Sequence, residues 1–256
     1  MAWAEPGAAA PNPFFTAHAR AYATSARHAA GRDLARLVAQ VGAGPGLTAV
    51  DVATGTGHTA LALAAAGCRV IGIDPTPAML AEAAALARER GLQDRVEFRP
   101  GWAEALPLPD RSARIVTCRR AAHHFTDVPR AVREMCRVLA PGGRLGISDM
   151  APEPGLGDEL DALERLRDPT HACAWDEDRW RAAVEGAGLR CLAVEVSVEE
   201  LSLEEWLAPA SPDGAEARAV RARLGALAPP LLAALCGGDP TRWRKRRMVL
   251  AAERPA

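Results

Sequence analysis

No apolar run in this 256-residue sequence reaches the length of a membrane-spanning helix. The longest candidate, "LGALAPPLLAAL", is split by Pro229 and Pro230. The amino-terminal stretch "MAWAEPGAAAPNPFF" has neither the basic segment nor the apolar segment of a signal peptide. We therefore expect a soluble, cytoplasmic protein without a membrane partner.

Paired cysteines are also lacking. None of the six cysteines belongs to a C-x-x-C pair: Cys68, Cys118, Cys136, Cys173, Cys191 and Cys236. This pattern disfavours a disulfide framework and a zinc site, so reduced thiols and no metal are expected.

Neither sign of charge is in excess, since 31 basic residues face 32 acidic ones and the net charge is -1. This balance gives no reason to expect a nucleic-acid partner. The one basic cluster is "RWRKRR", 242–247, which contains the only lysine, Lys245. Trp243 between cations is compatible with binding of phosphate or RNA. Charges on a solvated edge or penultimate strand also deter aggregation, and the neutral balance favours that interpretation.

Strand and helix patterns alternate along the first 150 residues. Strands are expected over 47–53, 69–74, 95–100, 113–119 and 144–148. The fifth is expected to follow a turn at "PGG", 141–143. Thr76 and Asp127 are predicted caps of two intervening helices. Such alternation predicts an α/β fold with a doubly wound parallel sheet.

Helical segments surround this core. A helical pattern runs from Phe14 to Val41 with a break near Gly31, after a loose tail over 1–13. Later segments are two helices near 156–166 and 176–187, a strand over 189–196, helices to about 236 and a strand over 246–253. One domain is expected, made of a front part (1–46), a core (47–150) and a carboxyl-terminal part (151–256).

A glycine-rich turn, "DVATGTGHTA", follows the first predicted strand and contains Gly55-x-Gly57-x-x-Ala60. Glycines there let a ligand approach the backbone, and Asp74 at the end of the second strand can accept both ribose hydroxyls of an adenosine. This signal alone allows both NAD and S-adenosylmethionine. Asp51 separates them, because a carboxylate repels a pyrophosphate and favours the sulfonium and ammonium of S-adenosylmethionine.

Several motifs follow one another in order: "VDVATGTG", "GIDPTPAML", "AEALPLPD", "RRAAHHFTD" and "EMCRVLAPGGRL". With these, residues 14–150 resemble the class I S-adenosylmethionine-dependent methyltransferases, in the ubiquinone/menaquinone C-methyltransferase-like branch (methyltransferase type 11). "YATSARH", 22–28, and "LRDPTH", 166–171, are most similar to bacterial members of unsettled substrate. The resemblance implies a Rossmann-like methyltransferase fold, a doubly wound, mostly parallel seven-stranded sheet with helical lid insertions.

The resemblance also implies residue roles around S-adenosylmethionine. The methionine half would lie against Asp51, Thr54, Gly55 and Gly57. The ribose and adenine would lie against Asp74, Pro75, Met79, Trp102 and Ala103. A lid over the cofactor carboxylate would be formed by Tyr22, Ser25 and His28, and Arg119 follows the position whose backbone meets the ammonium. Many relatives have Asp at the Trp102 position; an indole cannot accept the adenine hydrogen bond, so contact there would be stacking.

Candidate catalytic residues are His123 and His124, which follow the fourth strand, and His171 after the helix near 156–166. Orientation of the reactants supplies roughly 7–11 kcal/mol of the barrier, and a positioned base adds ~10²–10⁴-fold for a weakly acidic acceptor. Each histidine also has a structural interpretation, as core packing, a turn cap or a surface-loop residue. Asp149 ends the fifth predicted strand, where an aspartate either faces substrate or starts a turn. His58 is expected to be a first-turn residue of a helix rather than a base.

The sequence therefore predicts a methyltransferase that takes S-adenosylmethionine, releases S-adenosylhomocysteine and methylates a carbon, oxygen or nitrogen of a small molecule. The insertions over 151–182 and 200–238 would cover this acceptor. An NAD-type oxidoreductase on the same sheet and a non-catalytic S-adenosylmethionine-binding protein are the alternatives, with a macromolecular methyltransferase a lesser one. A monomer or homodimer is expected.

Overall fold

The computed structural model describes residues 12–208, 211 and 213–256. Nearly all of the tail predicted over 1–13 lies outside these residues. Its last two residues belong to the first helix instead of a loose tail, because Asn12 caps this helix and Pro13 begins it. The Asn12 side chain accepts a hydrogen bond from the amide of Phe14, which satisfies one of the free donors of that helix.

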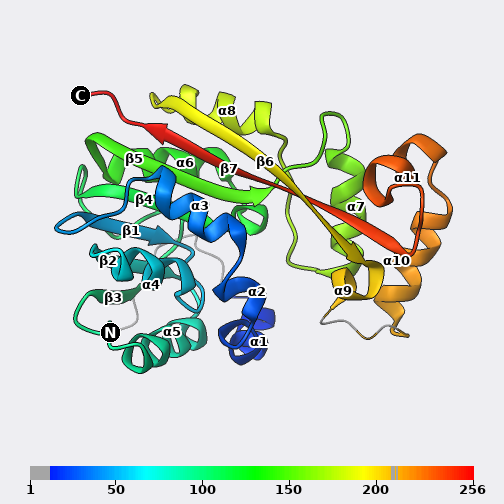
Figure 1. The fold of residues 1–256 in the computed structure, drawn as a ribbon, viewed down its shortest axis with the longest axis horizontal. Helices are drawn as coiled ribbons and strands as arrows, with labels where there is room; N and C mark the ends of the chain where they lie inside the picture. Colours follow the sequence, from blue (N-terminus) through cyan, green and yellow to red (C-terminus); the bar gives the residue numbers. More distant parts are fainter. Residues whose placement is uncertain (1–11, 209–210, 212) are drawn as a thin grey trace.

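The described residues form one seven-stranded sheet in the order β3-β2-β1-β4-β5-β7-β6 (Figure 1). The strands are β1 (Thr48–Val52), β2 (Arg69–Asp74), β3 (Val96–Pro100), β4 (Ala113–Arg119), β5 (Leu139–Met150), β6 (Arg190–Ser202) and β7 (Arg242–Glu253). Strands β1 to β5 pair in parallel, and β7 is antiparallel to β5 and β6. The predicted doubly wound, mostly parallel sheet is confirmed. Its order reverses between β1 and β4, and ligands of such sheets bind beyond the strand ends at that point.

Helices cover both faces of the sheet. They are α1 (Pro13–Ala23), α2 (Ala26–Ala29), α3 (Arg32–Gln40), α4 (His58–Ala65), α5 (Pro77–Glu89), α6 (Val128–Val138), α7 (Gly157–Arg167), α8 (Glu177–Gly186), α9 (Leu203–Leu207), α10 (Ala215–Gly225) and α11 (Pro229–Cys236), with a 3₁₀ turn, η1 (Ala122–His124). Successive strand residues face opposite layers. Ala49 packs in the core that contains α4, and Val50 packs in the core that contains α6 and α8.

The far ends of β6 and β7 leave the main sheet as an antiparallel ribbon and enter a second core with α7, α9, α10 and α11, here called the helical lobe (Figure 1). Trp206 of α9 stacks on Trp243 of β7 with ring centroids 3.8 Å apart. Both rings are almost fully buried, as are Trp175 and Trp180 in the main core. These four tryptophans therefore pack in the cores of the molecule.

Three predicted boundaries are wrong. The "PGG" residues do not form a turn before the fifth strand; they lie inside β5 as an irregularity in its pairing with β4, where Gly142 has φ +67°. The Arg114 guanidinium donates to the carbonyls of Pro141 and Gly142, so the irregular backbone stays hydrogen-bonded. The amino-terminal helical segment has the predicted break near Gly31 and a second break at Thr24 that was not predicted. The last two strands extend beyond their predicted ends because they pair with each other in the helical lobe.

All six cysteines are free thiols, in line with the prediction from their spacing. Within the described ranges, no helix combines the length and apolar character that a membrane crossing requires.

Candidate active site at the carboxyl ends of the strands

The glycine-rich turn after β1 is built on a buried carboxylate. Asp51 is 1% exposed, and its two oxygens accept hydrogen bonds from the hydroxyls of Thr54 (2.6 Å) and Thr117 (2.7 Å). Burial raises the pKa of Asp51 to about 6, although both hydroxyls oppose this shift. A carboxyl group in such a setting favours a cation beside it, because a nearby positive charge offsets the loss of solvation.

Gly55 and Gly57 serve this turn in different ways. Both have positive φ, 53° and 83°. A Cβ on Gly57 would lie 3.0 Å from the Cβ of Ala83, so this glycine allows α4 and α5 to approach. A Cβ on Gly55 would meet no atom within 4 Å, so its backbone borders open space. Gly55 is therefore the point of the turn at which a ligand can approach the main chain.

Asp74 ends β2 and joins two loops of the site. One of its oxygens accepts from the amide of Gly55 (2.9 Å) and the other from the amide of Thr76 (2.9 Å). Its residue is 7% exposed, and burial raises the pKa of Asp74. Each carboxylate oxygen has a second lone pair, so Asp74 can still accept from a ligand hydroxyl.

The residues predicted to contact adenine lie after β2 and β3. Met79 is buried on α5, Pro75 directly follows Asp74, and Ala103 is buried in the loop after β3. Trp102 is half-buried and forms an isolated bridge with Ala105. An indole that keeps part of its surface free can stack on a flat ring, which fits the predicted contact.

The predicted lid residues meet above the strand ends. The rings of Tyr22 and His28 are 5.0 Å apart, and the Ser25 hydroxyl lies 2.8 Å from Nδ1 of His28. The Tyr22 carbonyl lies 3.2 Å from Nε2 of His58, which begins α4 as predicted. Burial, followed by the charge of Arg120, lowers the pKa of His28 to about 3, so His28 is neutral at physiological pH.

A carboxylate that sequence reasoning missed anchors this lid to the sheet. Asp33 of α3 accepts hydrogen bonds from the guanidinium groups of both Arg119 (2.7 and 3.1 Å) and Arg120 (3.0 and 2.7 Å). The same two arginines donate to the carbonyls of His28 and Arg27 in α2. Burial alone would raise the pKa of Asp33, but the two arginines hold it far below its ordinary value.

Two strained residues frame the site. Among the described non-glycine residues, φ is positive only at Ala53 (53°), Arg111 (55°) and Arg120 (54°). Ala53 directly follows β1 and Arg120 directly follows β4, so two of the three border the crevice. Such conformations cost on the order of 1 kcal/mol or more and cluster at functional sites.

The three predicted catalytic histidines form one cluster. The ring centroids of His123 and His124 are 4.0 Å apart, and those of His123 and His171 are 5.7 Å apart. His123 and His124 lie on η1, and the backbone of the 172–173 segment bonds to the carbonyl of His123. The fold thus brings His171 to two histidines that lie 48 and 47 positions earlier in the sequence.

His123 forms a pair with Asp149 at the end of β5. The Nδ1 of His123 lies 2.6 Å from Oδ1 of Asp149, whose residue is 1% exposed. Burial alone would raise the pKa of Asp149, but His123 and then Arg247 hold it well below its ordinary value. Because an ionised carboxylate only accepts hydrogen bonds, Nδ1 of His123 carries a hydrogen, and in the neutral imidazole Nε2 is then the nitrogen that can accept a proton.

The other two histidines are held differently. Nδ1 of His124 lies 3.1 Å from the carbonyl of Thr170, and the ring of Phe15 covers His124 at 5.1 Å. Burial, followed by the charge of His123, lowers the pKa of His124 to about 3. His171 bonds to Asp161 (2.8 Å) and its side chain is 1% exposed. Of the three, His123 has the geometry of a general base.

Sequence signals for the missed residues differ in strength. Arg120 is one of two consecutive arginines after an apolar strand, which is an unusual position for two charges. Asp33 gave no such signal, because an acidic residue in the first turn of a helix is explained by the helix dipole. Asp161 lies within a helix whose charged residues resemble an ordinary exposed face.

Comparison with known proteins gives a consistent result. A family model described as "Methyltransferase domain" matches residues 50–147. An uncharacterized methyltransferase of Bacillus subtilis, YcgJ, is 41% identical over 170 residues, which cover 66% of this chain and 67% of that protein. Its crystal structure superposes with a TM-score of 0.81 and 28% identity over 88% of this chain and 98% of that chain.

Two further matches concern chemistry. A demethylmenaquinone methyltransferase of Thermus thermophilus is 45% identical over 107 residues, 41% of this chain and 48% of that enzyme, so the match spans about half of its length. The [4+2]-cyclase SpnF has a TM-score of 0.63 and 27% identity over 88% of this chain and 80% of its own. A fold of this kind therefore accommodates more than one reaction, and the residues of the site must carry the functional argument.

Proposed function

We infer that the methyl donor of this protein is S-adenosylmethionine and that its acceptor is a small molecule. The inference starts from the family: this chain belongs to the methyltransferase-domain family and is a methyltransferase. The comparisons give no support to an NAD-type oxidoreductase or to a non-catalytic binder. The observation that carries the assignment of the donor is the pair of buried carboxylates, Asp51 and Asp74, on either side of the open backbone of Gly55.

These residues fit S-adenosylmethionine in charge and in shape. Asp51 favours a cation and disfavours the pyrophosphate of a dinucleotide. Asp74 has free lone pairs for ribose hydroxyls, and Trp102 with Met79 offers surface to adenine. The buried Nδ1 of His58, close to the glycine turn, has no hydrogen-bond partner among the described residues, so a polar ligand group would satisfy it. When bound, S-adenosylmethionine supplies the electrophilic methyl group.

We assign the general base to His123. Its Nε2 takes the proton that the acceptor atom loses, and Asp149 fixes the ring orientation and stabilises the resulting imidazolium. His124 and His171 act as positioning residues, because both are buried and each is tied to a neighbour, Thr170 and Asp161. The packing of Phe15 on His124 excludes water from this side of the site.

A small-molecule acceptor agrees with the enclosure of the site. Helix α1 reaches the carboxyl end of α7, where the charge of Asp168 adds to burial in raising the pKa of Tyr22. Helices α1 and α2 thus cover this side of the site, which favours a small acceptor. The related enzyme from Thermus thermophilus is named for a small-molecule acceptor, demethylmenaquinone. We further propose that the protein has no nucleic-acid or membrane partner and is a monomer or homodimer. Its free thiols agree with a cytoplasmic location, where cysteines stay reduced.

Transfer of an isotopically labelled methyl group tests this function. The protein would be incubated with S-adenosylmethionine carrying a deuterated methyl group and a pool of small metabolites. We expect a labelled product and S-adenosylhomocysteine in equal amounts, and neither with the His123→Ala variant at the same time point. S-adenosylmethionine binding without any labelled product from broad acceptor pools would support a non-catalytic binder instead.

The affinity for S-adenosylmethionine should depend on pH through Asp51. The free protein holds this carboxyl with a pKa of about 6, and a bound cation favours its ionised form. Below pH 6 the proton must leave on binding, so affinity should fall by up to about tenfold per pH unit, and it should level off above pH 7. Calorimetric titrations between pH 5 and 7.5 would measure this. The Asp51→Asn variant is the control, and an equal slope in both proteins would exclude Asp51 as the cause.

A further inference from the structure

The basic cluster over 242–247 lies on β7, and the strand pleat divides it between two faces. Three arginines have partners: Arg242 pairs with Glu200, Arg244 donates to the carbonyl of Ala234, and Arg246 pairs with Glu177. The remaining positions, Trp243, Lys245 and Arg247, alternate with them and therefore share the opposite face. The prediction of a penultimate strand is confirmed, but the prediction of a solvated one is wrong, since Trp243 and Arg247 are buried.

Lys245 and Arg247 have no anionic partner. Neither side chain makes a hydrogen bond or an ion pair with any described residue, although Arg247 is only 8% exposed and its Nη1 is fully buried. Burial, followed by the charge of Arg247, lowers the pKa of Lys245 to about 7. A buried cation without a partner, such as Arg247, costs several kcal/mol of folding stability. Such a pair is explained if a ligand supplies the missing negative charge.

The carboxylates nearest to this pair are already engaged. Asp33 is shared by Arg119 and Arg120, and Asp149 bonds to His123. Glu164 of α7 accepts from Arg167 (2.6 Å) and from the indole nitrogen of Trp206 (3.3 Å). The surroundings of Lys245 and Arg247 therefore carry an excess of positive charge that the chain itself does not neutralise.

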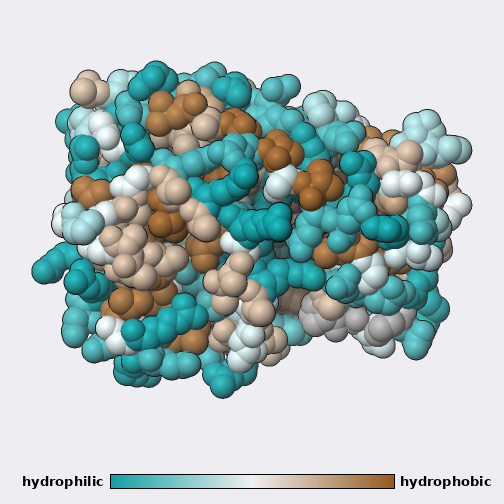
Figure 2. All heavy atoms as spheres, in the orientation of Figure 1, coloured by the Kyte–Doolittle hydropathy of each residue, from teal (hydrophilic) through white to brown (hydrophobic). Residues whose placement is uncertain are grey.

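The position of the pair points to the acceptor side of the site. In the sheet, β7 is three positions from β1, or about 14 Å at ordinary strand spacing. The donor would lie over β1 and β4, whereas Arg247 pairs with Met150 of β5, the residue after Asp149, which is the partner of His123. Hydrophilic side chains also line the depression between the sheet and the helical lobe in Figure 2.

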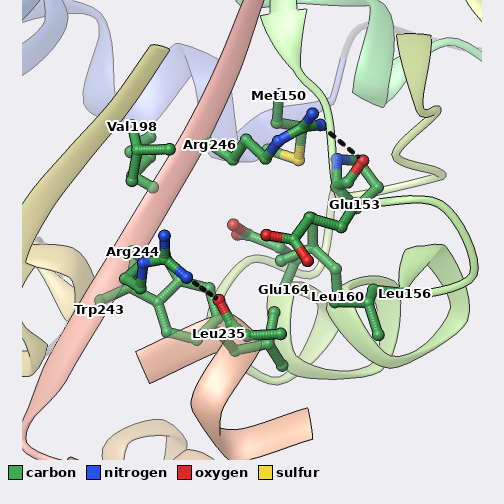
Figure 3. A pocket seen from close by; sticks show the side chains of 13 residues that line it. Met150, Glu153, Leu156, Leu160, Glu164, Val198, Leu235, Trp243, Arg244 and Arg246 are labelled. Atoms are coloured by element: carbon green, nitrogen blue, oxygen red, sulfur yellow. Dashed lines mark hydrogen bonds between the residues drawn. The ribbon is translucent and has the colours of Figure 1, made fainter. Parts of the chain in front are cut away.

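We propose that Lys245 and Arg247 bind an anionic group, a carboxylate or a phosphate, of the methyl acceptor. This assignment rests on the proposed function, because it takes the other end of the crevice as the donor site. The small pocket at the junction with the helical lobe, lined by Met150, Glu164 and Trp243 among others (Figure 3), is not the acceptor site itself. Its volume of about 30 Å³ holds roughly one water molecule.

Anion titrations test the proposal without knowledge of the acceptor. Inorganic phosphate and acetate would be titrated into protein saturated with S-adenosylhomocysteine, at constant ionic strength. We expect saturable binding of at least one of them to the unmodified protein, weakened about tenfold or more in both Lys245→Met and Arg247→Met. Arg242→Met is the matched control, because it removes an exposed cation of the same strand and should leave anion binding unchanged. Binding that is absent, or equal in all four proteins, would overturn the proposal.

The same variants distinguish an anionic group of the methyl acceptor from the carboxylate of the methyl donor. If the pair served the carboxylate of the donor, affinity for S-adenosylhomocysteine would fall in Lys245→Met, and the acceptor assignment would be wrong. We expect this affinity to change by less than about threefold. Failure of the unmodified protein to bind S-adenosylhomocysteine would instead refute the proposed function. Lys245 is only half-buried, so its variant keeps the test valid if Arg247→Met does not fold.

Proton uptake gives a readout that a purely structural role would not change. Lys245 faces Arg247 on its own strand, Glu164 and Arg167 of α7, and Arg120 after β4. An added anion favours the ammonium form, so acetate binding at pH 8 should take up a proton, and its affinity should fall as pH rises from 7 to 9. Calorimetry in two buffers of different ionisation enthalpy would measure the uptake, which should vanish in Lys245→Met; uptake that persists there would contradict the proposal.

Discussion

Replacement of His123 by alanine should lower kcat by about 10²–10⁴-fold while leaving the affinity for S-adenosylmethionine within about twofold. The imidazole is held 2.6 Å from an ionised Asp149, so its Nε2 is free to accept a proton from the substrate. The variant removes this acceptor but leaves the glycine turn and Asp74 in place. Turnover with the acceptor identified by labelling and calorimetric titration with the donor would measure the two effects separately.

Two controls separate a base from a positioning residue. His124→Gln keeps a polar group beside Thr170, and because His124 has a pKa of about 3 and is already neutral, we expect a loss of less than about tenfold. Asp149→Asn should lower kcat and change its pH profile, because an amide no longer fixes the ring tautomer. Full turnover in His123→Ala, with a large loss in His124→Gln, would reverse the assignment. Full turnover in all histidine variants, including His171→Ala, would exclude a histidine base.

Replacement of Asp33 by alanine should lower the free energy of unfolding by about 3–5 kcal/mol, because it leaves two buried guanidinium groups without their carboxylate. The side chains of Asp33 and Arg119 are 4% and 3% exposed, so water cannot replace the lost partner. Helix α2 should also loosen, since the same arginines bond to its carbonyls, and donor affinity should fall with it. Urea unfolding and calorimetry would measure the two effects.

The matched control is Arg36→Ala on the same helix. Arg36 pairs with Glu195 at the surface, where both side chains are about half exposed, and its loss should cost less than about 1 kcal/mol. The contribution of Asp33 to folding stability should also depend on pH. Its pKa is lowered in the folded protein, so its stabilisation is complete above the unfolded pKa near 4 and is lost as pH falls below it. Equal free energies of unfolding for the two variants would show that the bonds of Asp33 to Arg119 and Arg120 contribute little to stability.

The core of the fold could be predicted from the sequence because its local patterns agree with its tertiary structure. Strands β2 and β4 have the predicted bounds, and Asp127 caps α6 through the amide of Arg130 as predicted. The ribbon of β6 and β7 could not be predicted in full. Its outer half contains alternating charges that are typical of an exposed strand, and only the helical lobe explains why Leu201 and Trp243 between them are buried.

The residues proposed for the site each have a signal in the sequence, but the contacts among them do not. The glycine turn, Asp74 and the three histidines each have a local signal. The proximity of His123 to His171, and of Asp33 to two arginines, depends on how α3 and the loop after α7 pack against the strand ends. No periodicity encodes such long-range contacts, and for the same reason the unpaired Lys245 and Arg247 resemble surface charges in the sequence.

Calorimetric titration with S-adenosylmethionine, S-adenosylhomocysteine and NADH tests the proposed donor site at Asp51, Gly55 and Asp74. We predict micromolar binding of the first two to the unmodified protein and none of NADH. In a folded Asp74→Ala variant this binding should weaken about 100-fold or more, because two charge-assisted hydrogen bonds are lost, whereas the exposed Asp94→Ala should bind normally. Binding of NADH alone, or donor binding that is unaffected by Asp74→Ala, would contradict the proposed site.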